Sequence, residues 1–130
     1  MEHVYLVILL ALIEYMVFGG LVARARVRYG IAAPAITGSE PFERTFRVQQ
    51  NTLEGLVIFV PALWVFGAYV SPAAAAVLGL IGIVGRAIYA KSYIEAAEKR
   101  GLGAGICGIV NVILVLGGVI GLIGELLGYL

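Results

Sequence analysis

The sequence predicts an all-α integral membrane protein, a bundle of four membrane-spanning helices. Three observations predict it. Apolar residues make up 62% of the 130 residues and charged residues only 13%, the mean hydropathy is +1.02, and the apolar residues gather in four long runs. Soluble domains carry about a quarter charged residues. The length suits a single domain over residues 1–130.

The same composition excludes several other classes. A disordered chain needs more polar residues, and a disulfide-stapled fold is excluded because Cys107 is the only cysteine. A net charge of +1, with no basic surface apart from the apolar runs, argues against a nucleic-acid partner. His3 has no Cys or His at ligand spacing, so no metal site is expected.

The first apolar run covers residues 5–23 and is interrupted only by Glu14. A helix needs about 20 mostly apolar residues to cross about 30 Å of hydrocarbon. Helices are preferred over strands because each segment in lipid must satisfy its own backbone hydrogen bonds. The run lacks a basic flank before it and is longer than the core of a signal peptide, so we expect it to be retained.

The second run covers residues 53–70 and follows a polar, cytoplasmic loop over residues 24–52. This loop is long and contains prolines and glycines, which indicates a structured connection. We expect the second helix to begin several residues before the membrane, with Thr45 or Glu43 as its N-cap.

The third run covers residues 72–89 and opens with a proline, whose missing N–H is harmless there. We expect its helix to continue through a second polar loop, residues 90–102, as far as Arg100, and to end at Gly101. The fourth run covers residues 103–130. Its glycines, which predict close packing within one subunit or between subunits, are Gly117, Gly121, Gly124 and Gly128.

The basic residues predict the orientation. All nine lie in or beside the two polar loops: Arg24, Arg26, Arg28, Arg44, Arg47, Arg86, Lys91, Lys99 and Arg100. Because cytoplasmic loops carry the excess of Lys and Arg, both termini are expected on the non-cytoplasmic side. The short loops favour a bacterial inner membrane, although the endoplasmic reticulum also fits.

Polar residues share one face on each of two predicted helices. On the second helix, Arg47, Asn51 and Glu54 are spaced i, i+4 and i+7, which places them within about 60° of one another. On the third, the residues that share a face are Tyr89, Tyr93 and Arg100, with Arg86 beside them. Together with Arg26 at the end of the first span, these faces predict one polar pocket at the cytoplasmic membrane surface.

The residue types in this pocket suit a peptide-like ligand. Arginine forks bind carboxylates, and a buried glutamate favours an amine. Glutathione carries two carboxylates, one ammonium and amide groups, so it matches the set. The alternative is that these residues are ordinary interfacial anchors and that Arg47 simply pairs with Glu54. A buried Glu54 argues against that alternative, because charge inside the membrane boundary is costly.

Two motifs resemble those of a known family. The segment from Arg47 to Glu54, Arg-Val-Gln-Gln-Asn-Thr-Leu-Glu, is similar to the second-helix signature R-x-Q-x-N-x-x-E of the MAPEG family, the membrane-associated proteins of eicosanoid and glutathione metabolism. Arg86, Tyr89 and Tyr93 resemble the same family's R-x-x-Y-x-x-x-Y pattern, which a later arginine follows. The resemblance covers essentially the whole chain.

The resemblance implies a homotrimer with one glutathione site at each interface between subunits, glutathione being a co-substrate. Arg47, Asn51 and Glu54 match residues that grip the tripeptide. Gln49, which points away from them on the helix, matches a motif position with a similar role. Other matches are Arg26, at the end of the first helix, and the ligand-contacting tyrosines of the neighbouring third helix, Tyr89 and Tyr93.

Arg100 matches the arginine that the family uses to activate the thiol, so it is the expected catalytic residue. A thiol with a pKa of about 8.5 is only slightly ionised at neutral pH, and the thiolate is the nucleophile. A desolvated guanidinium beside the sulfur stabilises that anion. The sulfur would then attack a lipophilic electrophile that enters from the bilayer, so the implied function is a glutathione transferase, with peroxidase activity as a variant.

Some positions depart from the eicosanoid-synthesising members. Gly55 stands where they have a tyrosine, and Val27 where they have a second arginine, which favours general conjugation over eicosanoid synthesis. Two other functions stay open. One is a scaffold that binds glutathione or lipid without turnover. The other is a small proton-coupled multidrug transporter that uses Glu14, although Glu14 more simply pairs with an amide or a tyrosine of another helix, Asn111 being one candidate.

Overall fold

The computed structural model describes residues 1–128, and four long helices hold most of them. The helices are α1 (Glu2–Tyr29), α2 (Glu40–Tyr69), α3 (Pro72–Glu95) and α4 (Gly101–Leu126), with one 3₁₀ turn, η1 (Ala97–Lys99), before α4. Within this described range there is no strand, and all four helices are long and apolar enough to cross a membrane. The all-α expectation is confirmed.

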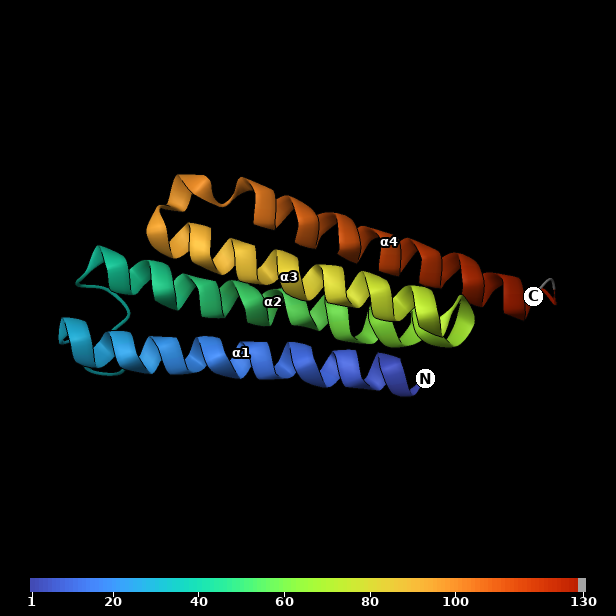
Figure 1. Ribbon diagram of the computed structural model, residues 1–130, viewed down its shortest axis with the longest axis horizontal. Coiled ribbons are helices and arrows are strands. Elements are labelled where there is room, and N and C mark those ends of the chain that lie inside the picture. The colour runs from blue at the N-terminus through green and yellow to red at the C-terminus, as the bar shows by residue number, and fades with distance from the viewer. Residues whose placement is uncertain (129–130) are drawn as a thin grey trace.

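The four helices form one antiparallel bundle in which α2 and α3 lie between α1 and α4 (Figure 1). Both marked ends of the chain lie at one end of the bundle, together with the short connection of Val70 and Ser71 between α2 and α3. The two longer connections lie at the opposite end, together with the ends of the helices beside them, and this end of the bundle carries most of the charged residues. The polar loops therefore sit together.

The core runs along the middle of the bundle. Its side chains with no measurable exposure include Val4 of α1, Leu63 of α2 and Leu114 of α4. A second buried cluster near the loop end joins Phe18, Val48, Tyr89 and Ala90. This second cluster fixes the positions of α2 and α3 beside the residues predicted to bind a ligand.

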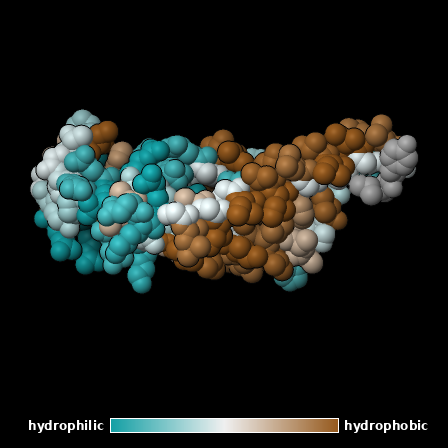
Figure 2. All heavy atoms as spheres, turned by 90° about the horizontal axis from the view of Figure 1, so that it is seen from above, coloured by the Kyte–Doolittle hydropathy of each residue, from teal (hydrophilic) through white to brown (hydrophobic). Residues whose placement is uncertain are grey.

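The outer surface is apolar over most of its length. Large apolar side chains on all four helices are exposed, among them Met16, Val57, Val84 and Ile120. Figure 2 shows these hydrophobic residues covering one part of the molecule and the hydrophilic residues gathered at the loop end. An apolar coat of this extent is stable against lipid and not against water.

The helix α2 begins earlier than predicted. Its N-cap is the extended residue Ser39, and Pro41 lies in the first turn, where its fixed backbone angle favours a helix start. The predicted caps are wrong: Thr45 lies inside the helix and its hydroxyl donates to the Pro41 carbonyl at 3.0 Å. Glu43 lies in the first turn. The connection between α1 and α2 is thus shorter than the predicted loop, residues 24–52.

The helix α3 ends at Glu95, so the prediction that it continues to Arg100 and stops at Gly101 is wrong. Ala96 is extended, and Gly101 opens α4. A side chain from α2 accounts for part of this end, because Arg44 Nε donates to the Ile94 carbonyl at 3.0 Å. The Ile94 carbonyl lies in the last turn of α3, where a carbonyl has no partner within its own helix, and Arg44 supplies the hydrogen bond.

Two of the four glycines that predict close packing, Gly117 and Gly121, pack inside the chain. Gly117 lies against the ring of Phe66, and Gly121 lies against the backbone of Tyr69, both in α2. The small-residue face therefore brings α4 close to α2. The helix ends at Leu126, so Gly128 lies outside it; residues 129–130 of the predicted fourth span lie outside the described residues.

Candidate functional site

An open groove of about 350 Å³ lies between α2, α3 and α4. It is lined by polar residues that come from all three helices and from the connection before α4. They are Asn51, Glu54, Arg86, Tyr89, Arg100 and Asn111. The groove thus brings together Asn51, Glu54, Tyr89 and Arg100 of the predicted site within a single chain, without a neighbouring subunit.

The innermost contact of the groove joins α2 to α3. Arg86 Nη1 donates to Asn51 Oδ1 at 2.7 Å. The Arg86 guanidinium carbon also lies over the Tyr89 ring, 5.1 Å from the centre of the ring. A hydrogen bond and a cation–π contact together hold the guanidinium across the gap between the two helices.

Gly55 makes room for this contact. A Cβ atom at residue 55 would lie 2.6 Å from Arg86 Nη2, which is too close for two non-bonded atoms. The absence of a side chain at this position is therefore what admits the guanidinium between α2 and α3. Gly55 stands where the eicosanoid-synthesising members have a tyrosine, and in this chain the Arg86 guanidinium lies beside that position.

Arg47 and Glu54 pair along the edge of the groove. Arg47 Nη1 lies 2.9 Å from Glu54 Oε1, and the two side chains are 49% and 59% exposed. The ion pair anticipated as an alternative is present, and the expectation that Glu54 is buried, which argued against this alternative, is wrong. Its exposure leaves unused donors on the guanidinium and unused acceptor sites on the carboxylate, so each group is open to a charged ligand.

Arg100 stands at the mouth of the groove in the connection between α3 and α4. Its guanidinium is exposed, and Nη1 donates to the Ala97 carbonyl at 2.8 Å. This bond anchors one side of the guanidinium fork and leaves the other donors available. The extended residue Ala96 and the turn η1, not a continuous helix, place Arg100 there.

Tyr93 lies one helical turn beyond the groove. Its ring stacks on that of Tyr89, with centroids 5.5 Å apart and planes 26° apart. Tyr93 is half-buried and packs against the cluster that contains Phe18 and Val48. Within one chain, its main contact with the site is through Tyr89.

Arg26 and Gln49 are not brought to the groove within one chain. Arg26 Nη1 donates to the Ala35 carbonyl at 2.7 Å and lies over the Phe42 ring, so it orders the connection between α1 and α2. Gln49 faces α1, where its Nε2 would lie 3.1 Å from a Cβ atom at Gly19. Its direction away from Asn51 agrees with the helical spacing.

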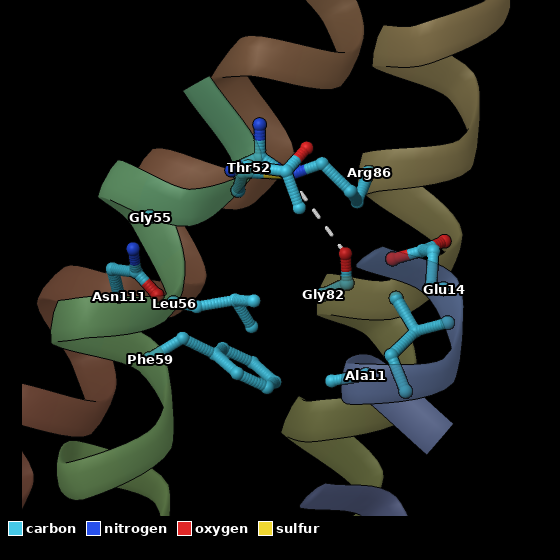
Figure 3. Close-up of a pocket in the computed structure, with 11 residues that line it drawn as sticks. Ala11, Glu14, Thr52, Gly55, Leu56, Phe59, Gly82, Arg86 and Asn111 are labelled. Carbon is cyan, nitrogen blue, oxygen red and sulfur yellow. Dashed lines mark hydrogen bonds between the residues drawn. The ribbon is translucent and has the colours of Figure 1, made fainter. Parts of the chain in front are cut away.

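A second, smaller space lies deeper in the bundle. It has a volume of about 30 Å³ and is lined by residues of all four helices, including Glu14 of α1, Arg86 of α3 and Asn111 of α4. Figure 3 shows Glu14 and Arg86 on one side of this cavity and Asn111 on the other. No hydrogen bond joins Glu14 to Asn111 in residues 1–128, so the simple pairing expected for Glu14 is absent.

Cys107 also borders both spaces. Its thiol is buried and donates a long hydrogen bond, 3.8 Å, to the Gly82 carbonyl, drawn as the dashed line in Figure 3. Asn111 lines the groove, although the sequence spacing does not place it in the predicted pocket. Arg86 also lines the groove, as expected for a residue beside the third-helix face, but no binding role is predicted for it. The signal in the sequence is the spacing of the motif. Arg86 stands three residues before Tyr89, so the two side chains lie on neighbouring parts of one helix face.

Comparison with known proteins decides the family. The sequence profile of the MAPEG family matches residues 4–120. This chain belongs to the MAPEG family.

Characterised members are among its relatives. Microsomal glutathione S-transferase 2 of Mus musculus is 44% identical over 113 residues, which cover 84% of this chain and 77% of that protein. Leukotriene C4 synthase of Cavia porcellus is 36% identical over 94 residues, covering 72% and 63% of the two chains. An uncharacterised protein of Synechocystis is 45% identical over 121 residues, covering 93% and 88%. As a MAPEG member with four membrane-length helices, the chain is an integral membrane protein.

Proposed function

We propose that this protein is a glutathione transferase that ionises the glutathione thiol and directs it at a lipophilic electrophile. The observation that carries the proposal is the groove, which Arg100 lines together with Asn51, Glu54 and Tyr89. The glutathione-dependent transferase named among its relatives supports the same ligand.

The groove supplies one group for each charged part of glutathione. Arg47 provides a guanidinium for a carboxylate, and Glu54 provides a carboxylate for the ammonium. Arg47 and Glu54 already form an exposed ion pair with each other. A ligand that carries both a carboxylate and an ammonium would replace this one ion pair by two, one with each residue. Asn51 and the two stacked tyrosines, Tyr89 and Tyr93, contribute hydrogen bonds and a flat wall.

Arg100 stabilises the thiolate. The thiol proton passes to water, and the sulfur anion is held beside the guanidinium, whose positive charge lowers the thiol pKa. The sulfur then forms a bond to the electrophilic carbon, and the leaving group departs with the bonding electron pair. With a lipid peroxide, two glutathione molecules supply the two electrons and become the disulfide, while the peroxide gives an alcohol and water.

The proposed assembly is a homotrimer in a bacterial inner membrane, with its sites beside the subunit interfaces. Arg26 and Gln49, which do not reach the groove of their own chain, would meet glutathione from the neighbouring subunit. The lipophilic substrate reaches the groove from the bilayer, where apolar compounds concentrate. The exposed apolar surface of all four helices supports this route.

The first test is an ultraviolet difference titration of the detergent-purified protein with glutathione, at about 240 nm, where a thiolate absorbs. We expect a saturable band at neutral pH in the wild type and its loss in Arg100→Ala. Lys99→Ala is the matched control, since Lys99 is a neighbouring exposed cation that does not line the groove.

The outcomes separate the alternatives. Glutathione binding without a thiolate band in the wild type would contradict thiol activation and leave a binding scaffold. A band that persists in Arg100→Ala would remove Arg100 from the catalytic role. Absence of glutathione binding would overturn the proposed function as a whole.

A further inference from the structure

The deep cavity is lined by one carboxyl group and one guanidinium group that form no direct ion pair. Glu14 and Arg86 both line it, yet the ion pairs within residues 1–128 involve only Glu2, Glu40 and Glu54 as acids. The cavity volume of about 30 Å³ is room for one or two water molecules, since each needs about 10–15 Å³ by this measure. A water molecule there would have polar partners in Glu14, Arg86 and Asn111.

Arg86 connects this cavity with the groove. The same guanidinium lines both spaces and makes its direct hydrogen bond to Asn51 at the groove end. Tyr89 covers one of its faces, and the missing side chain of Gly55 gives it the space to cross. The contacts with Asn51 and Tyr89 therefore fix the Arg86 guanidinium at the groove end. At the cavity end, its position depends on the group that balances its positive charge.

Glu14 is the acidic residue that lines the cavity together with Arg86. The other acid near the groove, Glu54, is already paired with Arg47. Glu14 lies well inside the apolar part of α1, where an ionised group is costly unless a partner compensates it. Arg86 carries the same cost, so the two groups stabilise each other across the cavity.

We propose that Glu14 is a positioning residue for the glutathione site, acting through Arg86. The carboxylate of Glu14, through water in the cavity, holds the Arg86 guanidinium against Asn51, and Asn51 is thereby kept oriented toward the ligand. This inference rests on the proposed function. It also assigns Glu14 a static role, in place of a proton-carrying one.

The test uses the detergent-purified full chain and measures two quantities, the glutathione Kd by calorimetry and the thiolate absorbance at saturation. We expect Glu14→Gln to raise Kd about tenfold while leaving the saturated thiolate band unchanged, because Arg100 is untouched. Glu14→Asp, which keeps the charge, should restore binding close to that of the wild type. Glu125→Gln, an exposed glutamate at the far end of α4, is the matched control.

A double-mutant cycle tests the route through Arg86. If Glu14 acts through Arg86, the pair Glu14→Gln and Arg86→Gln should bind no more weakly than Arg86→Gln alone. If Glu14→Gln is poorly folded, the double variant should recover thermal stability, because it removes both charges together.

Each contrary result has a distinct meaning. An unchanged Kd in Glu14→Gln, or additive losses in the cycle, would overturn this inference and leave the proposed function intact. Loss of the thiolate band at saturation in Glu14→Gln would also overturn it, since positioning of Asn51 does not act on sulfur. A wild-type protein that fails to bind glutathione would overturn both.

Discussion

At the scale of single residues, the contact between Arg86 and Asn51 depends on residue 55 being a glycine. Gly55 leaves the space through which Arg86 reaches Asn51. A glycine inside a helix costs about 0.5–1 kcal/mol relative to alanine. At Gly55 the missing side chain makes room for the partly buried hydrogen bond between the Arg86 guanidinium and the Asn51 amide.

We expect Gly55→Ala to weaken glutathione binding. The added methyl group would lie 2.6 Å from Arg86 Nη2 and would push the guanidinium away from Asn51. The KM for glutathione should rise about tenfold with kcat less affected, as expected when ground-state and transition-state binding fall together. A chlorodinitrobenzene conjugation assay measures both constants.

The control for Gly55→Ala is Gly20→Ala, because a Cβ atom at Gly20 meets nothing within 4 Å. Unchanged kinetics in Gly55→Ala would mean that Arg86 does not need to reach Asn51 for function.

At the scale of elements, the close approach of α3 and α4 positions Arg100. Gly103 of α4 lies directly against the backbone of Tyr89 in α3, so α4 begins in contact with the helix it follows. The chain between them, through Ala96 and η1, is short and returns Arg100 to the groove. The arginine that we propose as catalytic, Arg100, is thus positioned by the packing of α4 against α3.

We expect Gly103→Ala to separate α3 from α4 at this end. Forcing a methyl group against the Tyr89 backbone should destabilise the bundle by about 2 kcal/mol. It should also reduce the thiolate band, because Arg100 moves with the start of α4. Thermal unfolding in detergent and the ultraviolet titration measure the two effects.

Gly105→Ala is the matched control on the same helix, since a Cβ atom there meets nothing within 4 Å. Equal stability and equal thiolate absorbance in the two variants would show that this contact does not position Arg100.

At the scale of the whole molecule, hydropathy separates the bundle into two ends of different character. The hydrophilic end contains the connections of α1 with α2 and of α3 with α4 (Figure 2). Because cationic loops are retained in the cytoplasm, this end of the bundle is expected to face the cytoplasm, and the proposed glutathione site with it.

This orientation can be tested with single cysteines in a Cys107→Ala background. In sealed right-side-out vesicles, an impermeant maleimide should label Ser71→Cys directly. It should label Lys99→Cys only after the membrane is opened. The reverse pattern would contradict the orientation that the basic residues predict.

Much of this architecture could be predicted from the sequence because it depends on local patterns. Four apolar runs of membrane length specify four helices, and the i, i+4, i+7 spacing of Arg47, Asn51 and Glu54 places them on one helix face. Both patterns can be recognised within one segment of the sequence, without knowing how the helices pack against one another.

The remaining features depend on contacts between distant residues. Residues 94–100 contain good helix formers, yet α3 ends at Glu95, where Arg44 of another helix binds the Ile94 carbonyl. Arg26 and Arg100 look alike in sequence, as arginines at helix ends, but one orders a loop and the other faces the groove. Such roles are decided by contacts with residues that are distant in the sequence, and the spacing of residues along the chain does not reveal those contacts.

The tight connection at Val70 and Ser71 has a practical consequence for experiments. Ser71 is already engaged in its turn, since its Oγ accepts a hydrogen bond from the Ala74 N–H at 3.1 Å. Almost no peptide is therefore available between α2 and α3 for a protease or an antibody. Limited proteolysis would cut at the opposite connections, and an epitope inserted between Ala32 and Gly38 would be the accessible internal tag.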